Sequence, residues 1–236
     1  MDGSQNGEKK KTKRNSGDYT KMNKNNKKPL KTLVVKYTPR NERSNTKKIL
    51  DAFIGEIKNS DIERLDLVQD VPDLFLEQNL AAYIHRNYLG EELSSEQKNS
   101  LSKMDRMTAQ LKSADIVTVA FPMNNFSMPA PVKAWFDSVM LKGQTWDVKN
   151  GSYTGLMNGK KALTIVSSGA IYENGPMTPW EHALSLAKVE FQFMGYSDIR
   201  GILAGGMNAG EDVKSLNLEK SIKEVKTIAQ EWTREK

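Results

Sequence analysis

The chain has 236 residues, 38% hydrophobic and 27% charged, a composition typical of a soluble globular protein with one large domain or two small ones. It has no Cys, which excludes disulfide scaffolds, iron–sulfur clusters, thiol nucleophiles and cysteine-based zinc sites. Its only histidines, His85 and His182, are interpreted as structural or surface groups, so we expect no metal site. The net charge of +6 belongs to residues 1–29, which hold nine basic and three acidic residues, whereas the rest of the chain is neutral with 26 of each.

Residues 1–29 contain only two large apolar side chains, Tyr19 and Met22, and are predicted to be a disordered basic tail. The tail has no apolar central region, so we expect no secretory signal. A Lys-rich arm could contact nucleic acid or an anionic membrane, but its charges are not interleaved with aromatic residues, so a nucleic-acid partner is not expected. The longest uncharged stretch, residues 116–132, is interrupted by three prolines. We therefore expect no membrane span and a cytoplasmic location.

Residues 30–236 alternate short apolar runs with amphipathic segments and are predicted to form one domain. Strands are predicted at residues 32–37, 62–67, 115–121, 162–168 and 199–205. Helices are predicted at residues 44–58, 94–112, 129–141, 178–194 and 216–232. Residues 70–92 are ambiguous, and the Gly-rich residues 143–158 indicate a hairpin. Trp135 and Phe136 are assigned to the core.

Five strands that alternate with helices indicate an α/β fold with a parallel sheet covered on both faces. With right-handed crossovers, the economical arrangement is a doubly wound five-stranded sheet in the order 2-1-3-4-5. Ligands of such sheets bind beyond the carboxyl ends of the strands, which directs attention to the loops after the first, third and fourth strands.

The loop after the first strand supplies three hydroxyls, Thr38, Ser44 and Thr46, and leads into a predicted helix N-terminus. Backbone N–H groups and the helix dipole favour an anion there, and Arg40 and Arg43 add positive charge. The loop has neither G-x-G-x-x-G nor a P-loop motif, so it is neither a dinucleotide fingerprint nor the loop of a P-loop NTPase. Its hydroxyls and its helix N-terminus instead suit the three oxygens of a terminal phosphate. The alternative is that Ser44 serves only as a helix N-cap.

The loop after the third strand begins at Pro122, which ends the strand, and Asn124 and Asn125 favour a tight turn. Such a turn would present backbone N–H groups together with the flat faces of Met123 and Phe126, which suits a planar heteroaromatic ring. The alternative is an apolar loop that packs on its neighbouring helix.

The loop after the fourth strand carries the small residues Ser168, Gly169 and Ala170, which permit close approach of a ligand to the backbone. Tyr172 could stack on a ligand or hydrogen-bond to it. The alternative is an ordinary loop. Together, the three loops predict a phosphate cradle, a ring platform and a small-residue floor, which is a site shaped for a mononucleotide.

Three stretches carry a resemblance to a known family: ADIVTVAFPMNNFSMPAPVKAWFDSVMLKGQTW, GLMNGKKALTIVSSGAIY and FMGYSDIRGILAGGM. With the hydroxyl loop before them, they resemble the FMN-dependent NADH:azoreductase and NAD(P)H:quinone oxidoreductase family. The resemblance covers about residues 32–235. It implies a flavodoxin-like fold, FMN as cofactor, NADH or NADPH as hydride donor, and two-electron reduction of quinones or azo compounds by a ping-pong mechanism. It also implies a homodimer.

The resemblance assigns FMN contacts to the matched positions. The phosphate would be held by Thr38, Ser44, Asn45 and Thr46, the isoalloxazine by Pro122, Met123, Asn124, Asn125 and Phe126, and the pyrimidine side by Ser167, Ser168, Gly169 and Ala170. Asn124 stands where the family usually has Tyr, which removes an aromatic ring from one wall of the site. Ala170 stands where the family usually has Gly, which adds a methyl group. Tyr172 is a candidate proton donor or ring contact, and no other catalytic residue is assigned.

Two other functions stay open at this point. A flavodoxin-type electron carrier would bind FMN without oxidising NAD(P)H itself. A nucleic-acid-binding module working through the tail would show binding that depends steeply on salt. The sequence also leaves open whether Trp146, Trp180 and Phe191 lie at a dimer interface or in the core.

Overall fold

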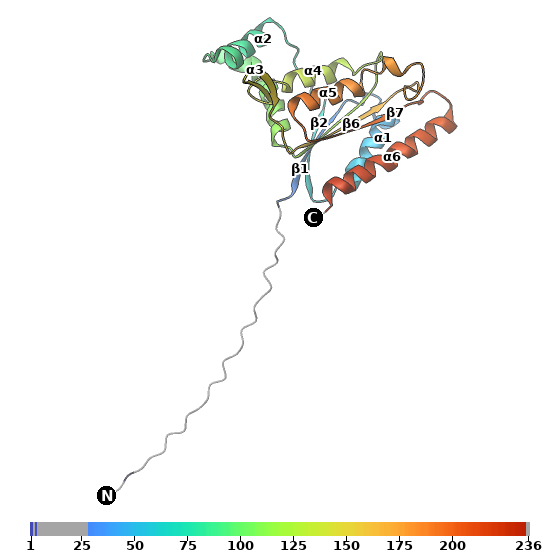
Figure 1. The fold of residues 1–236 in the computed structure, drawn as a ribbon, viewed down its shortest axis with the longest axis horizontal. Coiled ribbons are helices and arrows are strands. Elements are labelled where there is room, and N and C mark those ends of the chain that lie inside the picture. Colours follow the sequence, from blue (N-terminus) through green and yellow to red (C-terminus); the bar gives the residue numbers. More distant parts are fainter. Residues whose placement is uncertain (2, 4–27, 235–236) are drawn as a thin grey trace.

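Five parallel strands form the central sheet of the computed structural model. Their bounds are Leu30–Lys36 (β1), Ser60–Asp66 (β2), Ile116–Pro122 (β3), Lys161–Ser167 (β6) and Asp198–Ala204 (β7). Their order across the sheet is β2-β1-β3-β6-β7 (Figure 1). Each lies within two residues of a predicted strand. The predicted order 2-1-3-4-5 numbered only the strands of this sheet, in which β6 and β7 are the fourth and fifth along the chain.

The hairpin predicted within residues 143–158 consists of β4 (Trp146–Lys149) and β5 (Ser152–Gly155), which pair antiparallel outside the main sheet. Asn150 and Gly151 at its turn have φ angles of 51° and 77°, as a two-residue type I′ connection requires. The structure describes residues 1, 3 and 28–234, so the predicted tail lies almost wholly outside the described residues.

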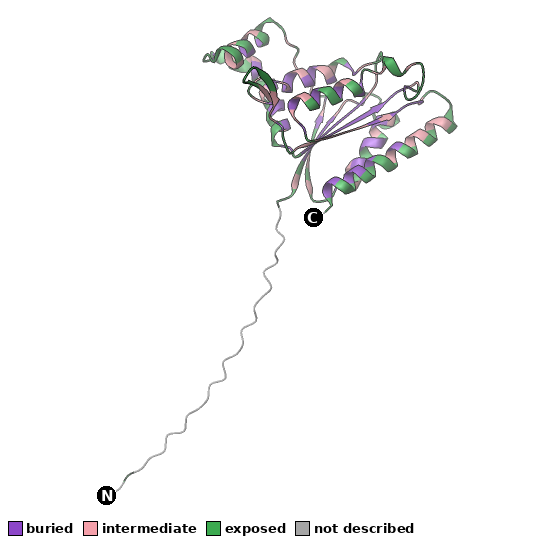
Figure 2. Cartoon of the chain, viewed as in Figure 1, coloured by how far each residue is buried: buried purple, intermediate pink, exposed green. Residues whose placement is uncertain are grey.

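Helices cover both faces of the sheet (Figure 1). One face carries α1 (Asn45–Glu56) and α6 (Glu211–Thr233), and the other carries α3 (Ser95–Ser113), α4 (Ala130–Val139) and α5 (Leu184–Met194). The strand side chains alternate between these layers: Val34 packs with α1 and α6, whereas Leu33 and Val35 pack with the other helices. Figure 2 shows the strands buried between helices whose outer faces are exposed.

Trp135 and Phe136 on α4 are fully buried in the core, as predicted. Phe191 on α5 is also fully buried and packs edge-to-face on Phe136, so it belongs to the core. Trp146 is partly buried, and its indole N–H donates to the carbonyl of Met140 at 2.9 Å. No helix within the described residues is both long and apolar enough to cross a membrane.

The helix predicted at residues 178–194 is wrong in its first part. Residues Thr178–Trp180 form a separate 3-10 turn, and α5 begins only at Leu184. The reason lies in Glu181, whose carboxylate accepts hydrogen bonds from the backbone N–H groups of Ala183, Leu184 and Ser185 at 2.7, 2.6 and 3.0 Å. A side chain that satisfies the first N–H groups sets the start of a helix.

The closing helix α6 begins at Glu211, five residues before its predicted start. Glu211 and Asp212 occupy its first turn, where negative charge interacts favourably with the helix dipole. The prediction relied on apolar spacing, which begins only further along the helix, and therefore missed this polar first turn.

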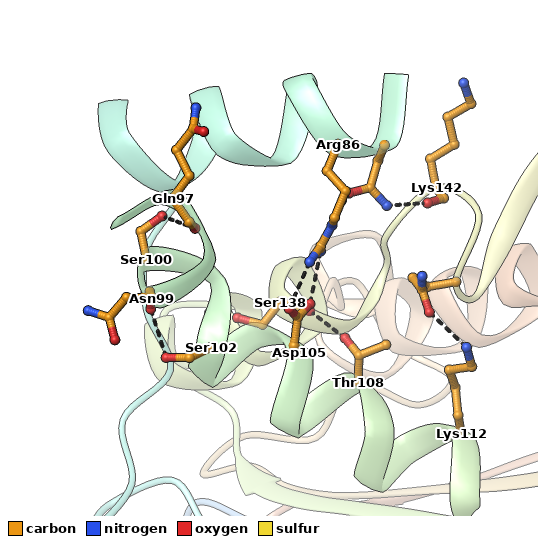
Figure 3. Close-up of polar contacts among 12 residues, drawn as sticks. Arg86, Gln97, Asn99, Ser100, Ser102, Asp105, Thr108, Lys112, Ser138 and Lys142 are labelled. Atoms are coloured by element: carbon orange, nitrogen blue, oxygen red, sulfur yellow. Dashed lines mark hydrogen bonds and ion pairs between the residues drawn. The ribbon is translucent and has the colours of Figure 1, made fainter. Parts of the chain in front are cut away.

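The ambiguous residues 70–92 contain α2 (Glu77–Ile84), which continues as a π-helical turn over His85–Leu89. Polar contacts join the end of this segment to α3 and to the loop after α4 (Figure 3). Arg86 donates two hydrogen bonds to Asp105 on α3 at 2.7 and 2.8 Å, and the amide of Asn87 donates to the carbonyl of Lys142 at 2.6 Å. Its outer face leaves four large side chains exposed, spaced four residues apart, which we call the α2 stripe: Leu76, Leu80, Ile84 and Tyr88.

Glu190 on α5 has a buried carboxylate, one oxygen of which has no hydrogen-bond partner among the residues that the structure describes. The ammonium of Lys133 lies 3.7 Å from its other oxygen, and Lys133 is itself paired with Asp137. Burial raises the pKa of Glu190 to about 7 from 4.5, against the opposing effect of Lys133. Because the folded-state pKa is the higher one, the folded state loses stability as pH rises from about 4.5 to about 7.

Glu190→Gln should therefore melt at a higher temperature than the wild type at pH 8, with little difference at pH 5. The pKa difference corresponds to a gain on the order of 3 kcal/mol. Thermal unfolding between pH 5 and 8 measures this directly. A variant with the same pH dependence as the wild type would contradict the assignment.

Candidate functional site

Three loops that the sequence singled out meet at the carboxyl end of the sheet, because β1, β3 and β6 are neighbours there. The hydroxyls of Thr46, at the start of α1, and Ser167, at the end of β6, lie 2.6 Å apart. The N–H of Met123, after β3, donates to the carbonyl of Ser167 at 2.8 Å. Residues far apart in the chain are thus joined directly at the carboxyl end of the sheet.

The loop after β1 runs through one 3-10 turn into α1. Ser44 is the N-cap of α1, since its hydroxyl accepts a hydrogen bond from the N–H of Lys47 at 3.2 Å, so the capping role is confirmed. Thr38 and Thr46 are fully buried, whereas Arg40 and Arg43 are exposed. The hydroxyl of Thr38 is buried and has no hydrogen-bond partner among residues 28–234.

A buried polar group without a partner is costly unless a ligand or water completes it. In this loop the Thr38 hydroxyl precedes the N-terminus of α1, whose N–H groups and dipole attract anions. The arrangement fits a phosphate. The exposed Arg40 and Arg43 attract an anion at long range but do not lie with the buried hydroxyls of Thr38 and Thr46.

The loop after β3 forms a tight turn between Asn124 and Ser127, whose backbones exchange hydrogen bonds of 2.9 and 3.0 Å. Its central residues are Asn125 and Phe126, with φ angles of 45° and 72°, so the turn is of type I′ and lies one residue later than predicted. A bulky residue rarely adopts positive φ, and such strain costs about 1–3 kcal/mol and concentrates at functional sites. The carbonyl of Phe126 accepts from the N–H of His182 at 2.8 Å, which helps to hold this conformation.

Phe126 lies at the centre of three aromatic rings that we call the aromatic rim: Phe126, Tyr172 and Trp180. Its ring contacts Trp180 at 5.5 Å and Tyr172 at 6.5 Å between centroids, both edge-to-face. Tyr172 is buried, whereas Phe126 and Trp180 are 41% and 53% exposed. The sequence predicts Trp180 on a helix, whereas the structure places it on the 3-10 turn beside Phe126, and no local signal indicates this contact.

The loop after β6 is tied to the loop after β7. Three backbone hydrogen bonds of 3.0 Å run to the carbonyls of Ser168, Gly169 and Ala170 from residues 206–208. Ser167 and Ser168 are buried, and the Ser168 hydroxyl donates to the carbonyl of Ala170 at 2.9 Å. A Cβ at Gly169 would lie 2.5 Å from the side-chain nitrogen of Asn208. The side chain of Asn208 packs against Gly169 and would have to move if residue 169 were larger, and the sequence did not indicate Asn208 as a neighbour of the site.

Comparisons with known proteins cover nearly all of the described chain. A family model described as a flavodoxin-like fold matches residues 30–228. An FMN-dependent NADH:quinone oxidoreductase of Azotobacter vinelandii is 28% identical over 204 residues, which cover 84% of this chain and 99% of that protein. An FMN-dependent NADH:quinone oxidoreductase 1 of Bacillus licheniformis is 30% identical over 204 residues, covering 84% and 98%.

Solved structures agree with this likeness. An FMN-dependent NADH-azoreductase from Bacillus anthracis in complex with FMN is 27% identical, with a TM-score of 0.78 over 87% of this chain and 100% of that one. An azoreductase from the Sterne strain of the same species is 23% identical with a TM-score of 0.80, over 86% and 99% of the two chains, and shows the shared fold.

Proposed function

Because the chain belongs to the family with the flavodoxin-like fold, we propose that it is an FMN-dependent oxidoreductase that takes a hydride from NAD(P)H and reduces quinones and azo compounds by two electrons. The observation that carries this proposal is the extent of the likeness. The alignment spans 99% of an FMN-dependent NADH:quinone oxidoreductase, so a whole enzyme is matched and not one module of it.

The residues present fit FMN. We assign the phosphate to Thr38, Ser44, Asn45 and Thr46, where the Thr38 hydroxyl lacks a protein partner. The isoalloxazine is assigned to the strained loop of Pro122, Met123, Asn124, Asn125 and Phe126, and its pyrimidine side to Ser167, Ser168, Gly169 and Ala170. Bound FMN would supply the redox chemistry, since its ring accepts a hydride and returns two electrons.

The protein's own contribution is orientation and exclusion of water. The left-handed turn at Asn125 and Phe126 fixes the direction of the backbone N–H groups of this loop, and the aromatic rim offers apolar ring faces and edges to the second substrate. We propose that the hydride donor and the acceptor use this surface in turn, which predicts ping-pong kinetics. Tyr172 stays a candidate proton donor or ring contact, and its ring lies 6.5 Å from that of Phe126 between centroids.

An anaerobic visible spectrum of the protein with FMN, before and after addition of NADH, tests the proposal. Protein-bound flavin that bleaches on addition of NADH and is reoxidised by a quinone would support it. Bound flavin that stays oxidised with both NADH and NADPH would favour an electron carrier. A protein that binds no flavin would contradict the assignment of all three loops.

Trp180→Ala should raise the KM for a two-ring quinone such as menadione by roughly tenfold, equivalent to about 1.4 kcal/mol of lost contact. The Kd for FMN should stay within about twofold, because Trp180 belongs to the rim and not to the assigned flavin contacts. Steady-state kinetics and fluorescence titration measure the two effects. Trp180→Phe should restore most of the affinity, and an unchanged KM in the alanine variant would remove Trp180 from the acceptor site.

We also propose that the protein is a homodimer whose interface includes the α2 stripe. Four large apolar side chains on one exposed face exceed the isolated exposed residues that are normal on monomers. Leu80→Glu should convert the dimer to a monomer in light scattering after size exclusion, whereas Leu216→Glu, at an exposed position on α6, should not. A wild-type mass of 26.6 kDa, that of one chain, would contradict the proposal. The cytoplasmic location stays a prediction.

A further inference from the structure

The two edges of the sheet differ in how they are protected. β2 forms one edge and exposes three charged side chains, Asp61, Glu63 and Arg64, which discourage pairing with another strand. β7 forms the other edge and, within the described chain, pairs only with β6. Its second half, residues 201–204, reads Gly-Ile-Leu-Ala and carries no charge. The second half of the β7 edge thus lacks the protection that β2 has, whereas its first half carries Asp198 and Arg200.

A groove runs along this edge. One hollow of about 490 Å³ is lined by Lys188 of α5, by Ile199, Arg200 and Gly201 of β7, and by α6 between residues 220 and 228. Because α5 and α6 cover opposite faces of the sheet, a hollow that touches both must pass over the open edge of β7. A second hollow shares Gly201 with the first and continues to Gly205. The two follow the strand for about 20 Å at 3.3 Å per residue.

The groove carries unpaired positive charge. Lys188, Lys220 and Lys223 line it, and none of their ammonium groups has an ion pair or hydrogen bond within the described part of the chain. The carboxylate of Glu224 lines both hollows and that of Glu173 lines the second, so the excess of positive charge lies in the first hollow, beside residues 199–201. Arg200 is already paired with Asp198 and Glu231 at 2.9 and 2.7 Å. A Cβ at Gly201 would lie 2.5 Å from Cδ1 of Leu184 and 2.7 Å from Cε of Lys188, so two α5 side chains pack over the middle of the strand.

We infer that this groove binds an extended acidic segment of a partner protein, which adds to the sheet as a sixth strand beside β7. An open strand edge offers main-chain hydrogen bonds to an extended chain, and lysines on both flanking helices offer pairing to acidic side chains on either face of it. A second copy paired through β7 would set these lysines against one another. The basic tail of this chain, residues 1–29, has the same sign of charge and is unsuited for the same reason.

The test uses the full-length protein loaded with FMN and a fluorescein-labelled peptide of about eight residues, the length of a typical strand, with Glu and Thr alternating. Fluorescence anisotropy at low ionic strength should show saturable binding. Lys223→Glu should raise the Kd about tenfold, whereas Lys226→Glu, an equal charge change on the same helix outside the groove, should change it less than about twofold. Both variants should keep the melting temperature and the quinone reductase activity of the wild type.

Hydrogen exchange separates strand addition from binding to a charged surface. Bound peptide should slow amide exchange at residues 199–204, and a peptide with Pro at alternate positions should not bind. Absence of saturable binding, equal weakening by the two Lys variants, or binding without protection of β7 would each overturn the inference. The anisotropy and hydrogen-exchange measurements do not rely on flavin chemistry, so their outcome is independent of the proposed enzyme activity.

Discussion

Thr38→Val is expected to weaken FMN binding at least about tenfold while leaving the flavin-free protein as stable as the wild type or more stable. Valine keeps the shape of threonine and removes only the hydroxyl, which is buried without a partner in the structure. A hydrogen bond to a charged phosphate contributes about 1.5–3 kcal/mol, whereas an unsatisfied buried hydroxyl costs about 1–3 kcal/mol. The affinity for FMN should therefore fall while the stability of the flavin-free protein rises.

Fluorescence titration of FMN and urea unfolding of the flavin-free protein measure these two effects. Thr118→Val is the matched control, because the hydroxyl of Thr118 is also buried without a partner but lies inside β3, away from the three loops. It should stabilise the flavin-free protein to a similar degree and leave the Kd for FMN unchanged. If Thr38→Val binds FMN as tightly as the wild type, the phosphate is not held at Thr38.

Gly155→Ala is expected to be the most damaging single-methyl change, with a loss of stability of about 3 kcal/mol. Gly155 ends β5 and lies against Gly195, the left-handed residue that ends α5. A Cβ at Gly155 would lie 2.3 Å from the backbone nitrogen of Gly195 and 2.4 Å from the carbonyl carbon of Met194. Backbone atoms cannot rotate away, so the hairpin must shift from the end of the helix.

The comparison for this variant is Gly55→Ala, which adds the same methyl group near the end of α1. A Cβ there meets nothing within 4 Å, and Gly in a helix costs about 0.5–1 kcal/mol relative to Ala, so this variant should be more stable than the wild type. The midpoints of urea unfolding, compared at equal slopes, give both values. A Gly155→Ala midpoint equal to that of the wild type would show that the contact between the hairpin and α5 is dispensable.

Much of the candidate site could be predicted, because its loops follow strands that have strong local patterns. Ser44 was identified as a cap from its residue type, and the tight turn after β3 was expected from two consecutive Asn residues. The centre of that turn was placed one residue early, since nothing local indicates that Phe126 adopts a positive φ. Its conformation is held from outside, by a hydrogen bond from His182.

The sequence by itself determined the succession of strands and helices, because burial on both faces of a strand or on one face of a helix imposes a repeat that can be read from neighbouring residues. It did not determine contacts between distant segments. The hydrogen bond between Thr46 and Ser167, the approach of Gly155 to Gly195, and the edge-to-face contact of Trp180 with Phe126 depend on which strands are adjacent and how closely their loops approach. Only the packed sheet and helices decide these distances, because the partners are separated along the chain by many residues whose local patterns carry no information about one another.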